Sequence, residues 1–171
     1  MQITRAADYA LRGMIYLARQ DPGKFTYIRE ISNEEGVPEK FMRKLFHILH
    51  KSGFIDSTRG KFGGIRLNIV PEEVTMLDII EAVDGPLALN LCLKWPDLCD
   101  RIDLCPMSDI WLEVQASVNK VLKQYTLKDI VNENRIQSWR KKNAENLVFH
   151  CIVGDNVNNK IIESDMIEKK D

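Results

Sequence analysis

Long apolar runs are missing from this chain of 171 residues. No stretch approaches the roughly 18 consecutive apolar residues that a membrane-spanning helix needs. The opening MQITRAADYALRGM has neither the apolar segment nor the small-residue cleavage site of a secretory signal. We therefore expect a cytoplasmic protein with no membrane partner. Thiols stay reduced in the cytosol, so structural disulfides are not the expected role of its four cysteines.

Two signatures of enzymes are also missing. The chain has no C-x-x-C pair of the kind that thiol oxidoreductases use, and no G-x-G-x-x-G between a strand and a helix. Its closely spaced glycines, Gly60, Gly63 and Gly64, fall in a predicted turn instead. A thiol redox enzyme is therefore a distant alternative, and we expect no enzymatic activity.

What the chain does have is a local concentration of positive charge. Hydrophobic residues make up 44% and charged residues 29%, which is ordinary for a globular protein with a sizeable core. The net charge is −1, but residues 38–66, called here the basic segment, hold seven Lys or Arg against two acids. The segment is thus +5 and the remainder −6. Such a basic segment in an acidic chain indicates a local site for a polyanion.

Periodicity divides the first 84 residues into three helices and a hairpin. Helices are predicted over 4–20, 26–35 and 38–52, and short strands over 54–58 and 65–69. We expect Phe41, Leu45, Ile48 and Leu49 to form the buried face of the third helix. This order is that of a winged helix-turn-helix, whose second helix enters the major groove of DNA.

The candidate DNA-binding side chains come from the third helix and from the hairpin turn. They are Lys40, Arg43, Lys44 and His47 on the helix, and Arg59 and Lys61 in the turn. The alternative is a solvated helix face beside an ordinary hairpin. The order of helix, turn, helix and basic hairpin favours double-stranded DNA as the partner.

The second half of the chain predicts further helices. Thr75 and Asp78 resemble a capping box that begins a helix ending near residue 84. A long helix should begin at Pro106, and a short one should follow from Thr126 to about Val131. The long helix has an apolar stripe that must bury against another surface: Ile110, Trp111, Val114, Val118, Val121, Leu122 and Tyr125. Residues 147–153, LVFHCIV, could form a strand.

These elements define the expected fold class, which is mainly α with a small β-hairpin wing. We expect a winged helix-turn-helix domain over residues 1–84, a cysteine-bearing sensor loop over 85–106, a dimerisation helix with a following short helix over 107–135, and a C-terminal extension over 136–171.

Three cysteines stand close together in the spacing C-x6-C-x5-C: Cys92, Cys99 and Cys105. A structural zinc site would normally show C-x2–4-C pairs and four protein ligands, and neither is visible locally. Iron–sulfur clusters are held by thiolates on more variable loops, and a residue other than cysteine can complete the set. Small apolar packing residues, a zinc site and a thiol switch remain as alternatives, but an iron–sulfur cluster is favoured.

The chain also resembles a known family. The segments MQITRAADYALRGMIYLA, EEGVPEKFMRKLFHILHKSGFIDSTRGKFGGIRL and LDIIEAVDGPLAL occur in order with the three-cysteine loop. Together they resemble the IscR/NsrR/CymR-type (Rrf-two) family of bacterial transcription regulators over about residues 1–135. The resemblance implies a homodimer that joins through the long helix and binds palindromic operators. In many members the cysteines hold an iron–sulfur cluster, either 2Fe–2S or 4Fe–4S.

The fourth ligand is where the chain departs from part of this family. Cluster-assembly members have a histidine three residues after the last cysteine, and here Ser108 stands there. Nitric-oxide-sensing members use an aspartate that matches Asp8, which could instead be an ordinary first-turn carboxylate. His150 and Cys151 are a rival pair. The resemblance thus implies Cys92, Cys99, Cys105 and Asp8 as ligands. A regulator of the same fold that senses through thiols, zinc or a protein partner is the nearest alternative.

Overall fold

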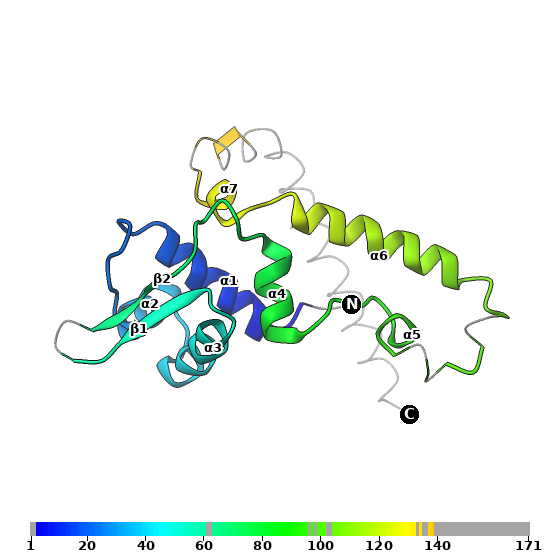
Figure 1. The fold of residues 1–171 in the computed structure, drawn as a ribbon, viewed down its shortest axis with the longest axis horizontal. Helices are drawn as coiled ribbons and strands as arrows, with labels where there is room; N and C mark the ends of the chain where they lie inside the picture. Colours follow the sequence, from blue (N-terminus) through cyan, green and yellow to red (C-terminus); the bar gives the residue numbers. More distant parts are fainter. Residues whose placement is uncertain are drawn as a thin grey trace, which may run out of the picture. The chain divides into compact units, whose positions relative to one another are not determined.

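The computed structural model describes residues 3–60, 63–95, 97, 99–101, 104–132, 134 and 137–138. Within them it contains these elements, in order: α1 (Arg5–Ala18), α2 (Ile28–Glu35), α3 (Glu39–Lys51), β1 (Ile55–Thr58), β2 (Gly64–Leu67), α4 (Met76–Asp84), α5 (Leu91–Lys94), α6 (Ser108–Lys123) and α7 (Leu127–Val131) (Figure 1). The predicted fold class, mainly helical with a β-hairpin wing, is confirmed.

The chain divides into two compact units, residues 1–131 and 132–171. The first unit contains every helix and strand named above. The predicted strand at 147–153 lies outside the described residues, as do His150 and Cys151. The expected sensor loop also contains a short helix, α5, which the sequence pattern did not indicate.

The first helices begin and end where local chemistry directs them. The side chain of Thr4 caps α1 by accepting a hydrogen bond from the backbone N–H of Ala7 at 3.1 Å. Helix α2 ends at Gly36, whose φ of 62° lies in the left-handed region. Pro38 occupies the N-cap position of α3, where the lack of an N–H costs nothing. Helices α1, α2 and α3 were therefore predictable to within a few residues.

The buried face of α3 differs from the predicted one. Met42, Leu45, Phe46 and Leu49 are buried, whereas Phe41 is 37% exposed and Ile48 is half-buried. The reason lies on the neighbouring helix α1. A Cβ added at Gly13 would lie only 2.9 Å from Cζ of Phe46, so the glycine makes room for that ring. Phe41 was wrongly assigned to the core.

The exposed ring of Phe41 still has a partner. It packs edge-on against Tyr9 of α1, with ring centroids 5.8 Å apart. Helix α3 is therefore held against α1 both by its buried face and by this contact at its first turn.

The hairpin is attached to the start of α2. Strands β1 and β2 pair antiparallel, with Ile55 opposite Leu67 and Thr58 opposite Gly64. Thr26 exchanges two backbone hydrogen bonds with Ile65, at 2.8 and 2.9 Å. Gly64 is required here, because a Cβ on it would lie 2.7 Å from the carbonyl oxygen of Thr26. These bonds fix the described part of the wing, residues 55–60 and 63–67, beside the helix-turn-helix.

The capping box of α4 is confirmed, with reciprocal hydrogen bonds between Thr75 and Asp78.

After α6 the chain returns to the winged-helix core. Beyond α6, the backbone of Tyr125 accepts a hydrogen bond from Met76 at 2.9 Å, and Leu127 donates to Val74 at 2.8 Å. Leu127 is completely buried in the core that α1, α3 and α4 form. Helix α7 therefore packs with the N-terminal helices, although a long helix separates it from them in sequence.

Candidate nucleic-acid interface and cysteine loop

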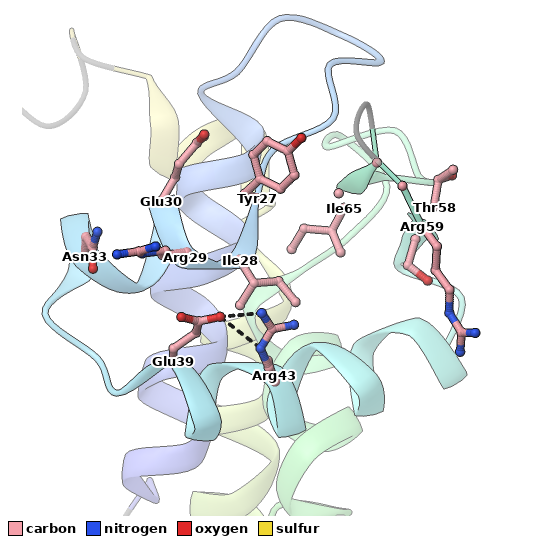
Figure 2. A pocket seen from close by; sticks show the side chains of 14 residues that line it. Tyr27, Ile28, Arg29, Glu30, Asn33, Glu39, Arg43, Thr58, Arg59 and Ile65 are labelled. Carbon is pink, nitrogen blue, oxygen red and sulfur yellow. Dashed lines mark hydrogen bonds and ion pairs between the residues drawn. The ribbon is translucent and has the colours of Figure 1, made fainter.

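A hollow of about 890 Å³ opens between α2, the first turn of α3 and the wing (Figure 2). Backbone and side chains from all three elements form its walls. The residues that line it are Tyr27, Ile28, Arg29, Glu30, Asn33, Glu39, Arg43, Ser57, Thr58, Arg59, Gly60, Gly63, Gly64 and Ile65. Since the wing is bonded to Thr26, at the start of α2, the two walls are held in a fixed relation.

The basic side chains around this hollow are exposed. Lys40, Arg43, Lys44 and His47 are all exposed on α3, and Arg59 is exposed on the wing turn. Of these, Arg43 and Arg59 line the hollow, whereas the other three lie elsewhere on α3. Lys61 lies outside the described residues.

One basic residue of the hollow was missed by the sequence reasoning. Arg29 is exposed on α2 and lines the wall opposite the wing. It lies outside the basic segment, so the charge count did not select it. Its place next to Ile28 at the start of an amphipathic helix was the signal that could have found it.

Arg43 is paired with an acid of its own helix. Its Nε donates to Oε1 of Glu39 at 3.0 Å, and its Nη2 donates to the same oxygen (Figure 2). The two side chains are 61% and 37% exposed, and they stand one helical turn apart. Exposed pairs of this kind contribute about 0–1 kcal/mol to stability, so the fold does not depend on this one.

The turn between α2 and α3 is braced from α1. Arg12 donates from Nε to Oε2 of Glu35 at 2.9 Å, and from Nη2 to the carbonyl oxygen of the same residue. The Arg12 guanidinium also lies 5.7 Å from the centroid of the Tyr9 ring. Because Glu35 ends α2, this contact fixes the angle at which the chain turns toward α3.

The three predicted cysteine ligands are half-buried free thiols. Cys92, on α5, and Cys99 line one hollow of about 440 Å³ together with Asn90, Leu91 and Trp95. Cys105 does not line it, and Asp8 lies exposed on the first turn of α1. Among the residues that the structure describes, no three His, Cys, Asp or Glu side chains lie close enough to hold a metal ion. The structure thus brings two of the four predicted ligands together.

Both ends of the cysteine loop are attached to α6. At the start, the backbone N–H of Leu89 donates to Oε1 of Gln115 at 2.8 Å. With its side-chain amide oriented so that the oxygen faces α6, Asn90 accepts from Nε1 of Trp111 at 3.2 Å. At the other end, Oγ of Ser108 donates to the carbonyl oxygen of Cys105 at 2.9 Å. The thiols are therefore held on a segment whose two ends rest on one helix.

Helix α6 leaves much of its apolar surface uncovered. None of its residues is buried, and Ile110, Val114 and Val121 are 40–51% exposed. A second hollow of about 440 Å³ runs along this outer face, lined by Glu113, Val114, Ser117, Val118, Val121 and Leu122. Trp111 is half-buried beside Asn90, so the predicted stripe does not point in one direction only.

Comparison with known proteins decides the family. Residues 3–133 match the model of the Rrf2 family, described as an iron-dependent transcriptional regulator. The chain belongs to the Rrf2 family. It is therefore a DNA-binding transcription regulator and not an enzyme. No described helix is long and apolar enough to cross a membrane.

Solved structures of transcription regulators have a similar fold. CymR of B. subtilis, the global cysteine regulator, is 26% identical with a TM-score of 0.64, over 77% of this chain and 96% of its own. A protein from Listeria innocua assigned as a transcriptional regulator is 28% identical with a TM-score of 0.67, over 78% and 88%. IscR of T. potens, at 23% identity over 78% and 88%, is similar in fold with a TM-score of 0.61.

Proposed function

We propose that this Rrf2 protein is a homodimer that reads a palindromic operator and is controlled by an iron–sulfur cluster. In this proposal α3 enters the major groove, and Arg59 at the wing turn enters the adjacent minor groove or contacts a phosphate. The observation that supports it most is the hollow to which α2, α3 and the wing each contribute an arginine, Arg29, Arg43 and Arg59. Arginines on three separate elements can contact a duplex across more than one strand of its backbone.

A second copy of the chain is the proposed partner of α6. The exposed valines and isoleucine of its outer face are apolar surface that water solvates poorly. The two winged-helix domains of a dimer can then contact half-sites about one helical turn, or roughly 34 Å, apart. A palindromic operator follows from this two-fold arrangement.

The proposed cluster ligands are Cys92, Cys99 and Cys105, with Asp8 as the fourth. Soft thiolates suit an iron–sulfur cluster, and Cys92 and Cys99 already share one hollow. When bound, such a cluster would supply iron that can bind a small reactant. The cysteines would hold the group on a loop whose two ends are hydrogen-bonded at α6, through Leu89 and Ser108.

A second candidate mechanism is direct sensing by thiols. The similarity to CymR, the global cysteine regulator, favours it, as does the hollow shared by two free thiols. In that case the DNA-reading surface and the dimer would be the same, and only the signal at the cysteine loop would differ.

The visible absorption spectrum of protein purified without oxygen distinguishes the two mechanisms. We expect a brown protein containing iron and acid-labile sulfide, whose operator affinity changes when the cluster is lost. In either mechanism the affinity should fall steeply with salt, since several cations replace counterions on the duplex. A colourless protein that contains zinc, or no metal, would contradict the cluster and favour sensing through thiols or zinc.

A further inference from the structure

Two residues of α3, Glu39 and Arg43, line the hollow between α2, α3 and the wing. The other basic residues of α3 that were predicted to bind DNA do not line it. Residues four apart on a helix lie on the same face, about 5–6 Å apart at their Cβ atoms. A duplex that enters this hollow therefore meets an acidic side chain next to a basic one, not a surface of positive charge alone.

The pairing uses one edge of the Arg43 guanidinium and leaves the other free. Arginine has five N–H donors, and Glu39 takes one from Nε and one from Nη2. Both N–H groups of Nη1 and the second of Nη2 remain. Within the part of the chain that the structure describes, no other residue bonds to them. This free end can donate to two acceptors at once, as O6 and N7 of guanine require.

Glu39 also keeps an acceptor of its own. Its Oε1 atom receives both bonds from Arg43, so Oε2 remains open on the same side of α3. Carboxylates accept from N4 of cytosine in the major groove, and guanine presents its acceptors beside that group. An acceptor oxygen next to a two-pronged donor therefore matches a G·C pair.

We propose that Glu39 is a specificity-determining residue of this regulator, selecting a G·C pair together with Arg43. The proposal rests on the DNA-reading role of α3 given above. On an A·T pair N6 of adenine can donate to the carboxylate, but the two adjacent acceptors that Arg43 requires are missing. On phosphates the carboxylate is repelled, which weakens binding there. The pairing with Glu39 also keeps Arg43 from turning to the nearest phosphate, so its donors stay directed at base edges.

Selection from randomised duplexes, with full-length protein purified without oxygen, provides the test. Wild type should select a G·C pair in each half-site. Glu39→Ala should lose that preference. Its ratio of operator affinity to scrambled-DNA affinity should fall by on the order of tenfold, mainly because scrambled DNA binds more tightly. The salt dependence on scrambled DNA should steepen by about 0.9 in logarithmic slope, as the freed Arg43 contacts one phosphate.

Two further variants control for folding and for charge. Glu39→Gln should show a smaller loss of specificity, because its amide oxygen still accepts from cytosine and from Arg43. Glu34→Gln removes the same charge from an exposed site on α2 that does not line the hollow, and should leave the affinity ratio within about twofold of wild type. Thermal melting by circular dichroism checks that each variant is folded.

Two results would overturn the inference: unchanged base preference in both Glu39 variants, or an equal loss of specificity in Glu34→Gln. A different result would contradict the proposed DNA-binding surface itself. If it were wrong, Arg43→Ala would bind operator as wild type does. If only the role of Glu39 were wrong, Arg43→Ala would lose operator affinity while both Glu39 variants kept the wild-type preference.

Discussion

At the scale of single residues, the carboxylates of this protein differ in whether they have a partner. Asp78 completes the capping box of α4, and Asp84 accepts from Oγ1 of Thr4 at 2.7 Å. Asp8 is exposed on the first turn of α1, and no described residue bonds to its side chain. Its carboxylate is therefore free to serve as a ligand, which the structurally engaged acids are not.

The variant Asp8→Ala separates a ligand from an ordinary first-turn acid. Loss of the interaction with the helix dipole should lower the free energy of unfolding by only about 0.3–1 kcal/mol. We expect the variant to retain iron but to lose its visible absorption faster in air than wild type. Absorption decay and chemical denaturation measure the two effects.

Asp109→Ala is the matched control, since Asp109 is an exposed acid in the first turn of α6. It should change stability by a similar small amount and leave the cluster unaffected. Equal cluster lifetimes in wild type, Asp8→Ala and Asp109→Ala would remove Asp8 from the ligand set.

At the scale of elements, different parts of the surface of α6 have different surroundings. Trp111 and Gln115 face the start of the cysteine loop, and Leu122 packs against the winged-helix core. Val114 and Val121, which remain exposed, line the outer hollow. In the proposed dimer, one helix would connect the cysteine loop, the winged-helix domain and a second subunit.

The variant Val114→Asp tests whether the outer face of α6 forms the dimer. An unpaired charge in an apolar interface is costly, so we expect a monomer by sedimentation velocity. Operator affinity should then fall by on the order of 100-fold, because two linked half-site contacts become independent.

Ala116→Asp adds the same charge to an exposed position of α6 that does not line the outer hollow. This control should remain a dimer with nearly wild-type affinity. A dimeric Val114→Asp variant with full affinity would mean that the second subunit binds elsewhere.

At the scale of the whole first unit, α6 is anchored by the segment that follows it. Leu127 is buried in the core, and Lys128 of α7 bonds to Glu72. That hydrogen bond lowers the pKa of the Glu72 carboxyl. The C-terminal end of α6 is therefore joined to the winged-helix core through the buried side chain of Leu127.

The variant Leu127→Ala tests whether α7 is part of the winged-helix core. Deleting a buried leucine should lower the free energy of unfolding by about 2–5 kcal/mol in a single transition shared with the winged-helix core. Urea denaturation followed by circular dichroism measures this loss. Leu104→Ala, at a leucine that is 87% exposed, should change stability by less than about 0.5 kcal/mol. A separate early transition, with the core unaffected, would show that α7 is not part of the domain.

Much of the fold was determined by interactions between residues near one another in sequence. The side chains of Thr4, Thr75 and Thr126 cap their helices by accepting from the backbone N–H three residues later. Helix α2 ends at Gly36, whose backbone adopts the left-handed conformation. Such contacts can be recognised in a sequence because both partners lie in one short window. Helix α3, the wing and the apolar residues of α6 followed from the same local patterns.

Only the tertiary structure decided which surfaces meet. Gly13 makes Phe46 rather than Phe41 the buried ring, because the space above a glycine on α1 lies beside α3 only after folding. The hollow likewise brings Arg29 and the Glu39–Arg43 pair together with the wing, and α7 returns to a core built by the first 84 residues. Periodicity indicates which face of a helix or strand is apolar and should be buried. It does not record what that face will pack against, because the partner lies far away in sequence and its distance depends on every element between them.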